Sequence, residues 1–406
     1  KLDEFMERSN LDEEDSYLPM NVDSADQLAK LMFDVLGIGL GKQLKLTKSG
    51  MRKSTGKKQL EQLKHEHEVV PKVLMYKERA KLKNTYTDPL PKLARFDPVT
   101  ETSRIHTTIL STRTSTRRYA SKDPNLQNIS KRTELGRRVR KAFIASPGME
   151  IVGADYSQAE MRLGAHYSQD ENLLRIFRLK LDPHTDTAKR AFKTETPDKM
   201  TQRDPCKNVN FGIFYGLSGV GLYDLMAVTY ATAKMPMPDW LTVEWCEQFI
   251  KDWFTLYPGV QGYLDQQHYR SYRYGLVWDL FGGIRRVPEV RSVHRRVVSA
   301  GLRQAGNMPI QASCAEWMKL AMAEVQERVV GEFRKDGLRC WPLMTVHDEL
   351  LLEVQEGYGD VAKGMSPPAS CHPRRVLTET STWQALATAS TMRQAASTSR
   401  ISPLPC

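Results

Sequence analysis

Hydrophobic residues recur at helical spacing along most of the chain. After an acidic, irregular stretch over residues 1–22, Ser24 precedes apolar residues at three- and four-residue intervals, a pattern that predicts a capped helix. A second helical pattern runs from Lys57 to Asn84, and Pro71 should kink or divide it. Residues 184–340 are also expected to be mostly helical.

Strand patterns are expected at two places. The apolar residues between Phe143 and Val152 predict a short strand that ends at Asp155, and a helical pattern follows over 160–177. Two later apolar runs flank His347 and Asp348, and a two-residue gap between apolar runs is typical of a hairpin. Both predicted strand regions therefore carry acidic side chains at one end.

The composition changes near the C-terminal end. Residues 357–406 are rich in Ser, Thr and Ala and show little apolar periodicity. Segments of this kind do not bury enough apolar surface to offset the entropy lost on ordering. We therefore expect an atypical, disordered tail over these residues.

The whole-chain composition is that of a globular protein. Apolar residues make up 40% of 406 residues, and at about 150 residues per domain the length predicts two or three domains. No run approaches the roughly 18 apolar residues of a membrane span, and the N-terminal stretch lacks the apolar core of a signal peptide. The cysteines are scattered without a CxxC pair, which favours free thiols in a reducing, cytoplasmic compartment. Because Lys1 is not a Met, we expect the chain to be part of a longer protein.

Positive charge concentrates in two segments. Lys and Arg total 59 against 48 Asp and Glu, so the formal net charge is +11. Basic residues dominate residues 41–58 and 112–141. A solvated charged surface would explain either segment alone, but the net charge favours a polyanionic partner.

Two local patterns supply carboxylates. DYSQAEMR places Asp155 at the end of a strand and Glu160 five residues later, although such an Asp is more often a helix cap. VHDE places Asp348 and Glu349 at the hairpin tip, where a charged turn is the alternative. If the fold brings these carboxylates together, they repel one another unless cations hold them, and oxygen ligands suit Mg²⁺. Two such ions would activate an attacking hydroxyl and stabilise a leaving phosphate oxygen.

A third pattern places a cation and two aromatic rings on one helix face. Lys207, Phe211 and Tyr215 recur every four residues, so they share one side of a helix. Asp204 and Pro205 fit the cap and first position of that helix, which leaves Arg203 just outside it. A half-buried helix with no special function is the alternative.

Taken together, these patterns resemble a known family. In this order, DYSQAEMR, RxxxKxxxFGxxYG and VHDE resemble motifs A, B and C of the family A DNA polymerases, the bacterial polymerase I and phage replicase group. DPNLQNI, GRRVRKAFI, DPHTDTA, YPGV and RQAGNMPIQ also look like that family, and the resemblance covers about residues 24–355.

The resemblance implies an α+β right-hand polymerase with a helical thumb, helical fingers and an antiparallel-sheet palm. The expected boundaries are an N-terminal segment at 1–22, the thumb at 23–112, the palm at 113–164 and 301–356, the fingers at 165–300 and the tail at 357–406. The family normally continues after the hairpin with a helix and a terminal strand, and residues 357–406 show neither pattern.

The resemblance also implies residue roles. Two Mg²⁺ ions, or Mn²⁺ in their place, would be held by Asp155, Tyr156 and Asp348. Glu349 and Lys207 would complete the catalytic set. The residues implied to bind the dNTP are Arg203, Lys207, Phe211, Tyr215, His184 and Glu160. The residues implied to bind DNA are Arg118, Gln127, Asn128, Arg132, Asn307, Gln311, Arg303, His347, Lys48, Lys53 and Lys57.

The implied activity is template-directed DNA synthesis, in which a primer 3′ hydroxyl attacks the α-phosphate of a dNTP. Primer-template DNA and dNTPs would be the partners of a monomer in the cytoplasm of a bacterial or phage-infected cell, with no membrane partner. No proofreading or 5′ nuclease domain is expected, because the thumb-like sequence leaves no room before motif A. Two alternatives stay open: a catalytically impaired DNA-binding remnant, suggested by the tail, and a single-subunit RNA polymerase, against which Glu160 argues.

Overall fold

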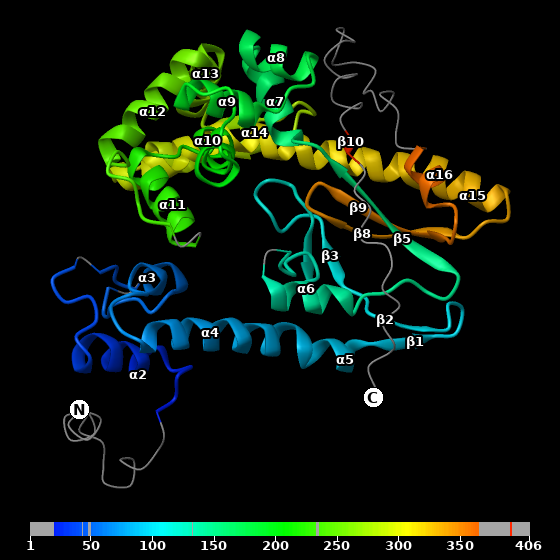
Figure 1. Ribbon diagram of the computed structural model, residues 1–406. Coiled ribbons are helices and arrows are strands. Elements are labelled where there is room, and N and C mark those ends of the chain that lie inside the picture. Colours follow the sequence, from blue (N-terminus) through cyan, green and yellow to red (C-terminus); the bar gives the residue numbers. More distant parts are fainter. Residues whose placement is uncertain are drawn as a thin grey trace. The chain divides into compact units, whose positions relative to one another are not determined.

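The computed structural model describes residues 20–42, 44–47, 50–131, 133–232, 235–364 and 390–391. The chain divides into two compact units, Lys1–Lys92 and Leu93–Cys406 (Figure 1). The first unit ends before the predicted thumb boundary at residue 112, and the subdomain limits stay predictions. Within the described residues, no helix is long and apolar enough to cross a bilayer.

The first unit is a small helical bundle. Its helical segments are α2 (Ala25–Ala29), η2 (Lys30–Val35), α3 (Lys57–Gln62), α4 (Val69–Leu82), η3 (Lys83–Thr87) and α5 (Pro89–Leu93). The side chain of Ser24 caps α2 by accepting from the Gln27 amide, as the sequence predicts. Pro71 lies in the first turn of α4, where a missing amide hydrogen breaks no helical hydrogen bond, so the predicted division falls just before it. Leu28, Met32 and Leu60 are fully buried at the centre of the bundle.

The second unit is built on an antiparallel sheet. Its strand order is β10 (Ser390–Thr391), β5 (Met149–Tyr156), β9 (Glu349–Gln355) and β8 (Cys340–Val346). The hairpin of β8 and β9 turns at His347 and Asp348, and His347 takes a left-handed backbone conformation with a φ of 59°. The antiparallel sheet and the position of the hairpin tip confirm the sequence prediction.

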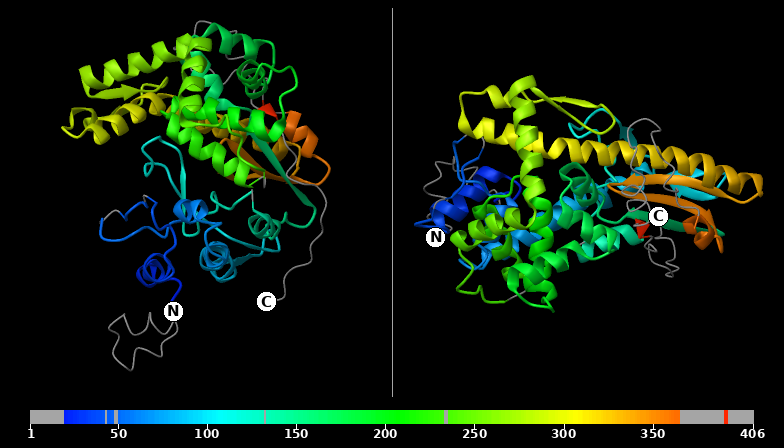
Figure 2. Two further views of the ribbon diagram at one scale, coloured as in Figure 1. Left: turned by 60° about the vertical axis from the view of Figure 1, so that its left-hand side comes forward. Right: turned by 90° about the horizontal axis from the view of Figure 1, so that it is seen from above.

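One long helix covers a face of this sheet. Figure 2 shows α14 (Arg295–Glu324) as the long yellow helix that runs across the sheet and continues through η6 (Val325–Val330) and α15 (Gly331–Lys335). Apolar side chains of α14, η6 and α15 pack on apolar side chains of β5, β8 and β9. They form one cluster that includes Met318, Ala321, Phe333, Leu350 and Val354. This packing holds the edge of the sheet that carries the acidic residues.

A helical region is inserted between β5 and α14. Its helices are α7 (Ala159–Ser168), α8 (Glu171–Arg178), α9 (Pro183–Phe192), η4 (Lys199–Arg203), α10 (Asp204–Phe214), α11 (Gly219–Thr232), α12 (Val243–Leu256) and α13 (Pro258–Tyr274). The helical pattern over 160–177 is confirmed, but it forms two helices, because Gln169 ends α7 in a left-handed conformation. The Asp170 side chain then caps α8 by accepting from the Leu173 amide at 3.1 Å.

Short elements complete the second unit. They are the pairs β1 (Arg95–Asp97) with β2 (Thr102–Arg104), β3 (Thr108–Leu110) with β4 (Ala120–Lys122) and β6 (Leu276–Trp278) with β7 (Ile284–Arg286), together with α6 (Glu134–Lys141) and η5 (Pro288–Arg291). The third pair interrupts the region that the sequence predicts to be mostly helical. Three-residue strands leave too short an alternation for the pattern to predict.

The predicted tail begins too early. The chain forms α16 (Gly359–Gly364), and Ala362 is only 3% exposed against the core of the sheet. Ser390 and Thr391 pair with Tyr156 and Asp155 of β5. The prediction of a disordered tail over 357–406 is therefore wrong for 357–364 and for Ser390 and Thr391. The rest of the predicted tail lies outside the described residues.

Candidate active site

The acidic residues of the two motifs meet at one edge of the sheet. Asp155 of β5 is the register partner of Glu349 of β9. The Tyr156 amide, one residue further on, donates to the Asp348 carbonyl at 3.1 Å. A strand end and a hairpin tip separated widely in sequence thus place Asp155, Asp348 and Glu349 side by side.

Two cations contact the acidic groups. Arg118 forms an ion pair with Glu160 and lies 3.6 Å from Asp348 Oδ1. Lys131 Nζ lies 2.6 Å from Glu349 Oε2. Burial raises the pKa of Glu160 and the Asp348 charge adds to this, while Arg118 opposes it. Burial lowers the pKa of Arg118, but attraction to Glu160 and Asp348 outweighs it, so the net shift is upward.

A buried thiol also faces the hairpin tip. Cys314 of α14 is fully buried, and its Sγ lies 3.6 Å from Asp348 Oδ1. Burial raises the pKa of this thiol well above its usual value, so it is protonated and can donate to the carboxylate. On the neighbouring strand, the Tyr156 ring packs on Trp317 of α14 with centroids 4.3 Å apart. The long helix therefore contacts both acidic motifs.

A small cavity opens beside Asp348. Arg118, Gln127, Thr345 and His347 are among the residues that line it. Gln127 Nε2 donates to the Thr345 carbonyl at 3.0 Å, which ties its side chain to β8. Three residues that the sequence implies to bind DNA thus lie around one opening.

The motif B residues form a second group, on α10 and α9. The helix begins at Asp204, one residue earlier than predicted, and Arg203 ends the preceding η4. Arg203 Nη2 lies 2.6 Å from Asp182 Oδ2, the acidic group that caps α9. Lys207 is exposed on the first turns of α10. Its exposure leaves the ammonium accessible to an anionic ligand.

Aromatic residues continue this face of α10. The Phe211 ring lies 5.6 Å, centroid to centroid, from the ring of His184 on α9. Tyr215 follows the last helical residue, and Gly216 then takes a φ of +71°. A Cβ at Gly216 would lie 2.4 Å from Arg303 Cγ, so the chain and the Arg303 stem meet closely here.

Arg303, Asn307 and Gln311 lie four residues apart on α14 and therefore share one side of it. Arg303 Nη1 donates to Ser299 Oγ at 2.7 Å. Asn307 Oδ1 is buried, and no hydrogen-bond partner for it occurs in the described part of the chain. Asn128, by contrast, is exposed in the loop that precedes α6.

The remaining implied DNA contacts are only partly described. In the first unit, Lys53 Nζ lies 3.9 Å from Asp34 Oδ1 and above the ring of Phe33, while Lys57 is exposed. Lys48 and Arg132 lie outside the described residues.

Several residues that shape the site were not predicted. Lys131 reaches Glu349 across 218 positions of sequence, and no local spacing indicates such a pair. Cys314 lies inside a helix, where a lone cysteine gives no signal. Asp182 could have been found, since an Asp before Pro183 is the pattern of a helix cap.

The donor set is compatible with a hard divalent ion. Among the described residues, no group of three or more His, Cys, Asp or Glu side chains is placed to hold a metal. Mg²⁺ is usually bound by one or two carboxylates, with the remaining ligands from water and substrate phosphates. Asp155 and Asp348, adjacent at the sheet edge, supply two carboxylates of this kind.

The match to one protein family decides the classification. The sequence model of DNA polymerase family A matches residues 6–366. The chain belongs to this family. The α+β right-hand fold predicted from the sequence is therefore confirmed.

Individual proteins of family A are similar to this chain in sequence. The chain is 41% identical over 348 residues to the thermostable DNA polymerase I of Thermus caldophilus, which covers 85% of this chain and 38% of that protein. It is 37% identical over 350 residues to the DNA polymerase I of Pseudomonas aeruginosa, covering 86% of this chain and 36% of that protein. The chain thus spans less than half the length of these relatives.

A solved family A structure is also similar. The POL domain of Pol1 from M. smegmatis, in complex with DNA primer-template and dNTP, matches 90% of this chain and 62% of its own, at a TM-score of 0.72 and 32% identity.

Proposed function

We propose that this chain is a DNA-directed DNA polymerase that adds dNTPs to a primer 3′ end by two-metal-ion nucleotidyl transfer. The observation that carries the proposal is the pairing of Asp155 with Glu349 beside the Asp348 turn, which gathers hard oxygen ligands at one sheet edge. Membership of family A supports the same activity.

Asp155, Tyr156 and Asp348 would hold Mg²⁺. When bound there, Mg²⁺ would supply activation of the primer hydroxyl and charge neutralisation at the phosphate. Glu349, the residue after Asp348, would support these ligands. Its ion pair with Lys131 would limit the negative charge of the cluster.

The groups on α10 and α9 would receive the triphosphate. The exposed ammonium of Lys207 and the guanidinium of Arg203 are cations on adjacent helical segments, and the ring of His184 on α9 lies against Phe211. Lys207 would donate a proton to the departing pyrophosphate, and Phe211 would stack on the incoming nucleotide. Tyr215 and Gly216 would shape the pocket for the template base.

Arg118, Asn307 and Gln311 would donate hydrogen bonds to the minor groove, where purine N3 and pyrimidine O2 occur in every correct pair. Such contacts check the shape of the base pair without reading its sequence. Gln127, Asn128 and Arg132 would contact the primer or template, and the lysines at 48, 53 and 57 would contact duplex phosphates. We expect the protein to act as a monomer.

Neither alternative has a specific observation in its favour. The remnant alternative depends on the absence of a helix and a strand after the hairpin, but α16 follows β9 and β10 pairs with β5. The RNA polymerase alternative lacks support because the family match is to DNA polymerases.

Primer extension with Mg²⁺ tests the proposal. Asp155→Ala and Asp348→Ala should abolish extension and leave primer-template binding within a few fold, because these side chains would hold metal and not the duplex. Asp252→Ala is the matched control, since Asp252 accepts a hydrogen bond from Gln248 on the surface of α12, on the helical insertion and not in the acidic cluster. Extension at the wild-type rate by either site variant, or none by the wild type, would contradict the proposed activity.

A further inference from the structure

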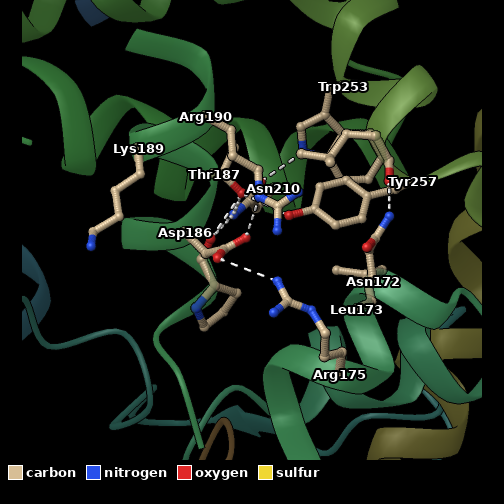
Figure 3. Close-up of polar contacts among 12 residues, drawn as sticks. Asn172, Leu173, Arg175, Asp186, Thr187, Lys189, Arg190, Asn210, Trp253 and Tyr257 are labelled. Carbon is tan, nitrogen blue, oxygen red and sulfur yellow. Dashed lines mark hydrogen bonds and ion pairs between the residues drawn. The ribbon is translucent and has the colours of Figure 1, made fainter. Parts of the chain in front are cut away.

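The amide of Asn210 is oriented by a neighbour that can only donate. Asn210 lies on α10 and is fully buried. Its Oδ1 accepts from Trp253 Nε1 of α12 at 2.8 Å, and Figure 3 shows the two side chains pointing at one another. An indole N–H has no acceptor capacity, so the atom that faces Trp253 must be the amide oxygen. The amide nitrogen is thereby turned toward α9.

The amide nitrogen faces three acceptors on α9. Asn210 Nδ2 lies 3.2 Å from the Pro183 carbonyl, 3.1 Å from Thr187 Oγ1 and 3.1 Å from His184 Nδ1. The Thr187 hydroxyl lies 2.8 Å from the Pro183 carbonyl, closer than its 3.2 Å to Asn210 Oδ1 and 3.3 Å to the Tyr257 hydroxyl. Donation to the Pro183 carbonyl leaves the Thr187 oxygen free to accept. Since an amide NH₂ group cannot accept a hydrogen bond, His184 Nδ1 must face it with a lone pair.

We propose that Asn210, held by Trp253, is a positioning residue that keeps His184 as the neutral tautomer with its proton on Nε2. In that form His184 presents a hydrogen-bond donor to an anionic oxygen of a bound nucleoside triphosphate. The ligand part of this inference rests on the proposed function. The tautomer part rests only on the contacts of Asn210.

The surroundings of His184 keep the ring neutral. It is 2% exposed. The charged groups that face it are Asp182 at the start of α9, Arg203 of η4, and Asp204 and Lys207 of α10. The pKa of His184 is lowered to about 4, mainly by burial, with Arg203 and Lys207 adding to the shift and Asp182 and Asp204 opposing it. A second proton on Nδ1 would also point at the Asn210 amide hydrogens.

No hydrogen bond to His184 Nε2 is found among the described residues. A donor on this atom, beside the cations Arg203 and Lys207, is suited to an anion that arrives from solution. A neutral ring gives this donor at any pH near 7, whereas an ordinary histidine with a pKa of about 6.5 would change its charge there.

Nitrogen-15 NMR of the histidine-labelled protein tests the tautomer directly. Loss of one ring signal in His184→Gln assigns the residue. We expect a lone-pair shift for Nδ1, a protonated shift for Nε2 and no titration between pH 6 and 8. A protonated Nδ1, or a ring that titrates in this range, would overturn the proposal. No DNA synthesis is needed for this measurement, so its failure is distinct from failure of primer extension.

Asn210→Asp is the informative variant. It preserves the shape of the side chain but replaces the donor with an acceptor, so His184 should take its proton on Nδ1 and Nε2 should become an acceptor. Asn172→Asp is the matched control, because Asn172 donates to the Leu256 carbonyl at 2.7 Å on the nearby α8 (Figure 3). Its His184 signals should be those of the wild type.

Steady-state kinetics give the second measurement. In Asn210→Asp, the new carboxylate favours the charged form of His184 at pH 6, and this imidazolium still carries a proton on Nε2. As the pH rises to 8 the ring loses that proton, so KM for the dNTP should rise about tenfold, while kcat changes less. In the wild type and in Asn172→Asp, KM should be flat over this range. A flat KM in a folded Asn210→Asp protein would contradict the positioning role. If this variant does not fold, the wild-type NMR result still decides the tautomer.

Discussion

Asp155 and Glu349 are directly opposite one another on adjacent antiparallel strands, so their side chains leave the sheet on the same side. Asp348 adds a third carboxylate from the turn. Lys131, from the loop before α6, forms an ion pair with Glu349 at 2.6 Å. The positive charge of Lys131 therefore reduces the net negative charge of this cluster.

Replacing Lys131 with Met should lower the Mg²⁺ concentration needed for half-maximal extension by about threefold. The variant removes one positive charge beside the acidic cluster, and charges a few ångströms apart at a protein surface interact by about 1 kcal/mol or more. A Mg²⁺ titration at saturating dNTP measures this. Lys122→Met is the control, because Lys122 pairs with Asp123 at 2.8 Å on an exposed surface. A higher Mg²⁺ requirement in Lys131→Met would contradict the electrostatic role.

Glu160→Ala should raise the efficiency of rNTP relative to dNTP incorporation by at least about tenfold, or roughly 1.4 kcal/mol of discrimination. Glu160 lies in the first turn of α7, one turn beyond Asp155, and Arg118 pairs with its carboxylate. The ion pair holds the side chain where we expect the sugar 2′ position, so a ribose hydroxyl would meet filled space.

Comparison of kcat/KM for dCTP and rCTP opposite the same template G measures this discrimination. Glu160→Gln is the matched control, since it keeps the volume of the side chain and removes its charge. If the filter is steric, the Gln variant should retain most of the discrimination. An unchanged ratio in Glu160→Ala would show that Glu160 does not exclude ribose.

Local sequence patterns predict the parts of this site that are formed by residues close together in the sequence. Two apolar runs separated by His347 and Asp348 are enough to predict a hairpin, and the observed turn is at these two residues. The same patterns missed the break at Gln169, because the cap made by Asp170 competes with an uninterrupted apolar period. A residue that can cap a helix, when it lies inside an apolar helical pattern, therefore indicates a possible break between two helices.

Long-range polar pairs could not be predicted. Asn210 is a polar residue in an apolar stretch of α10, and nothing in its neighbours indicates that Trp253 and His184 lie on either side of it. Its contacts depend on how α9, α10 and α12 pack, which is a property of the folded core. The motifs predict which residues form the site. The residues that orient them, such as Asn210, can be identified only from the packing of the folded chain.

Glu353→Gln should destabilise the protein by about 2 kcal/mol at pH 7, since hydrogen bonds to buried charged groups contribute about 1.5–3 kcal/mol. Glu353 is 2% exposed on β9 and accepts from Arg104 at 2.6 Å, the Ser146 amide at 2.7 Å and Trp341 at 2.5 Å. Burial alone would raise the pKa of Glu353, but these hydrogen bonds outweigh it and the net shift is downward.

The sign of the pH dependence follows from this downward shift. A carboxyl group with a lowered folded-state pKa stabilises the fold above its unfolded pKa of about 4.3, and this contribution is lost as the pH falls through the folded-state value. The difference between wild type and Glu353→Gln should therefore be full at pH 7 and should shrink below about pH 4. Urea unfolding at several pH values measures it, with the exposed Glu356→Gln as control. A difference that is independent of pH would show that the carboxylate charge is not what stabilises this site.

Truncation after Gly357 should lower the melting temperature by roughly 2–4 °C relative to truncation after Gly364, the shift expected for about 1 kcal/mol in a domain of this size. The shorter chain loses Ala362 from the core of the sheet and the Tyr358 ring, which lies 6.3 Å from the Phe333 ring. It also loses the Gly359 amide that donates to Glu150 Oε1 at 2.7 Å, which leaves that carboxylate with the Gly357 amide at 3.2 Å. Because both truncations remove everything after Gly364, the comparison isolates α16, and equal melting temperatures would mean that α16 does not stabilise the sheet.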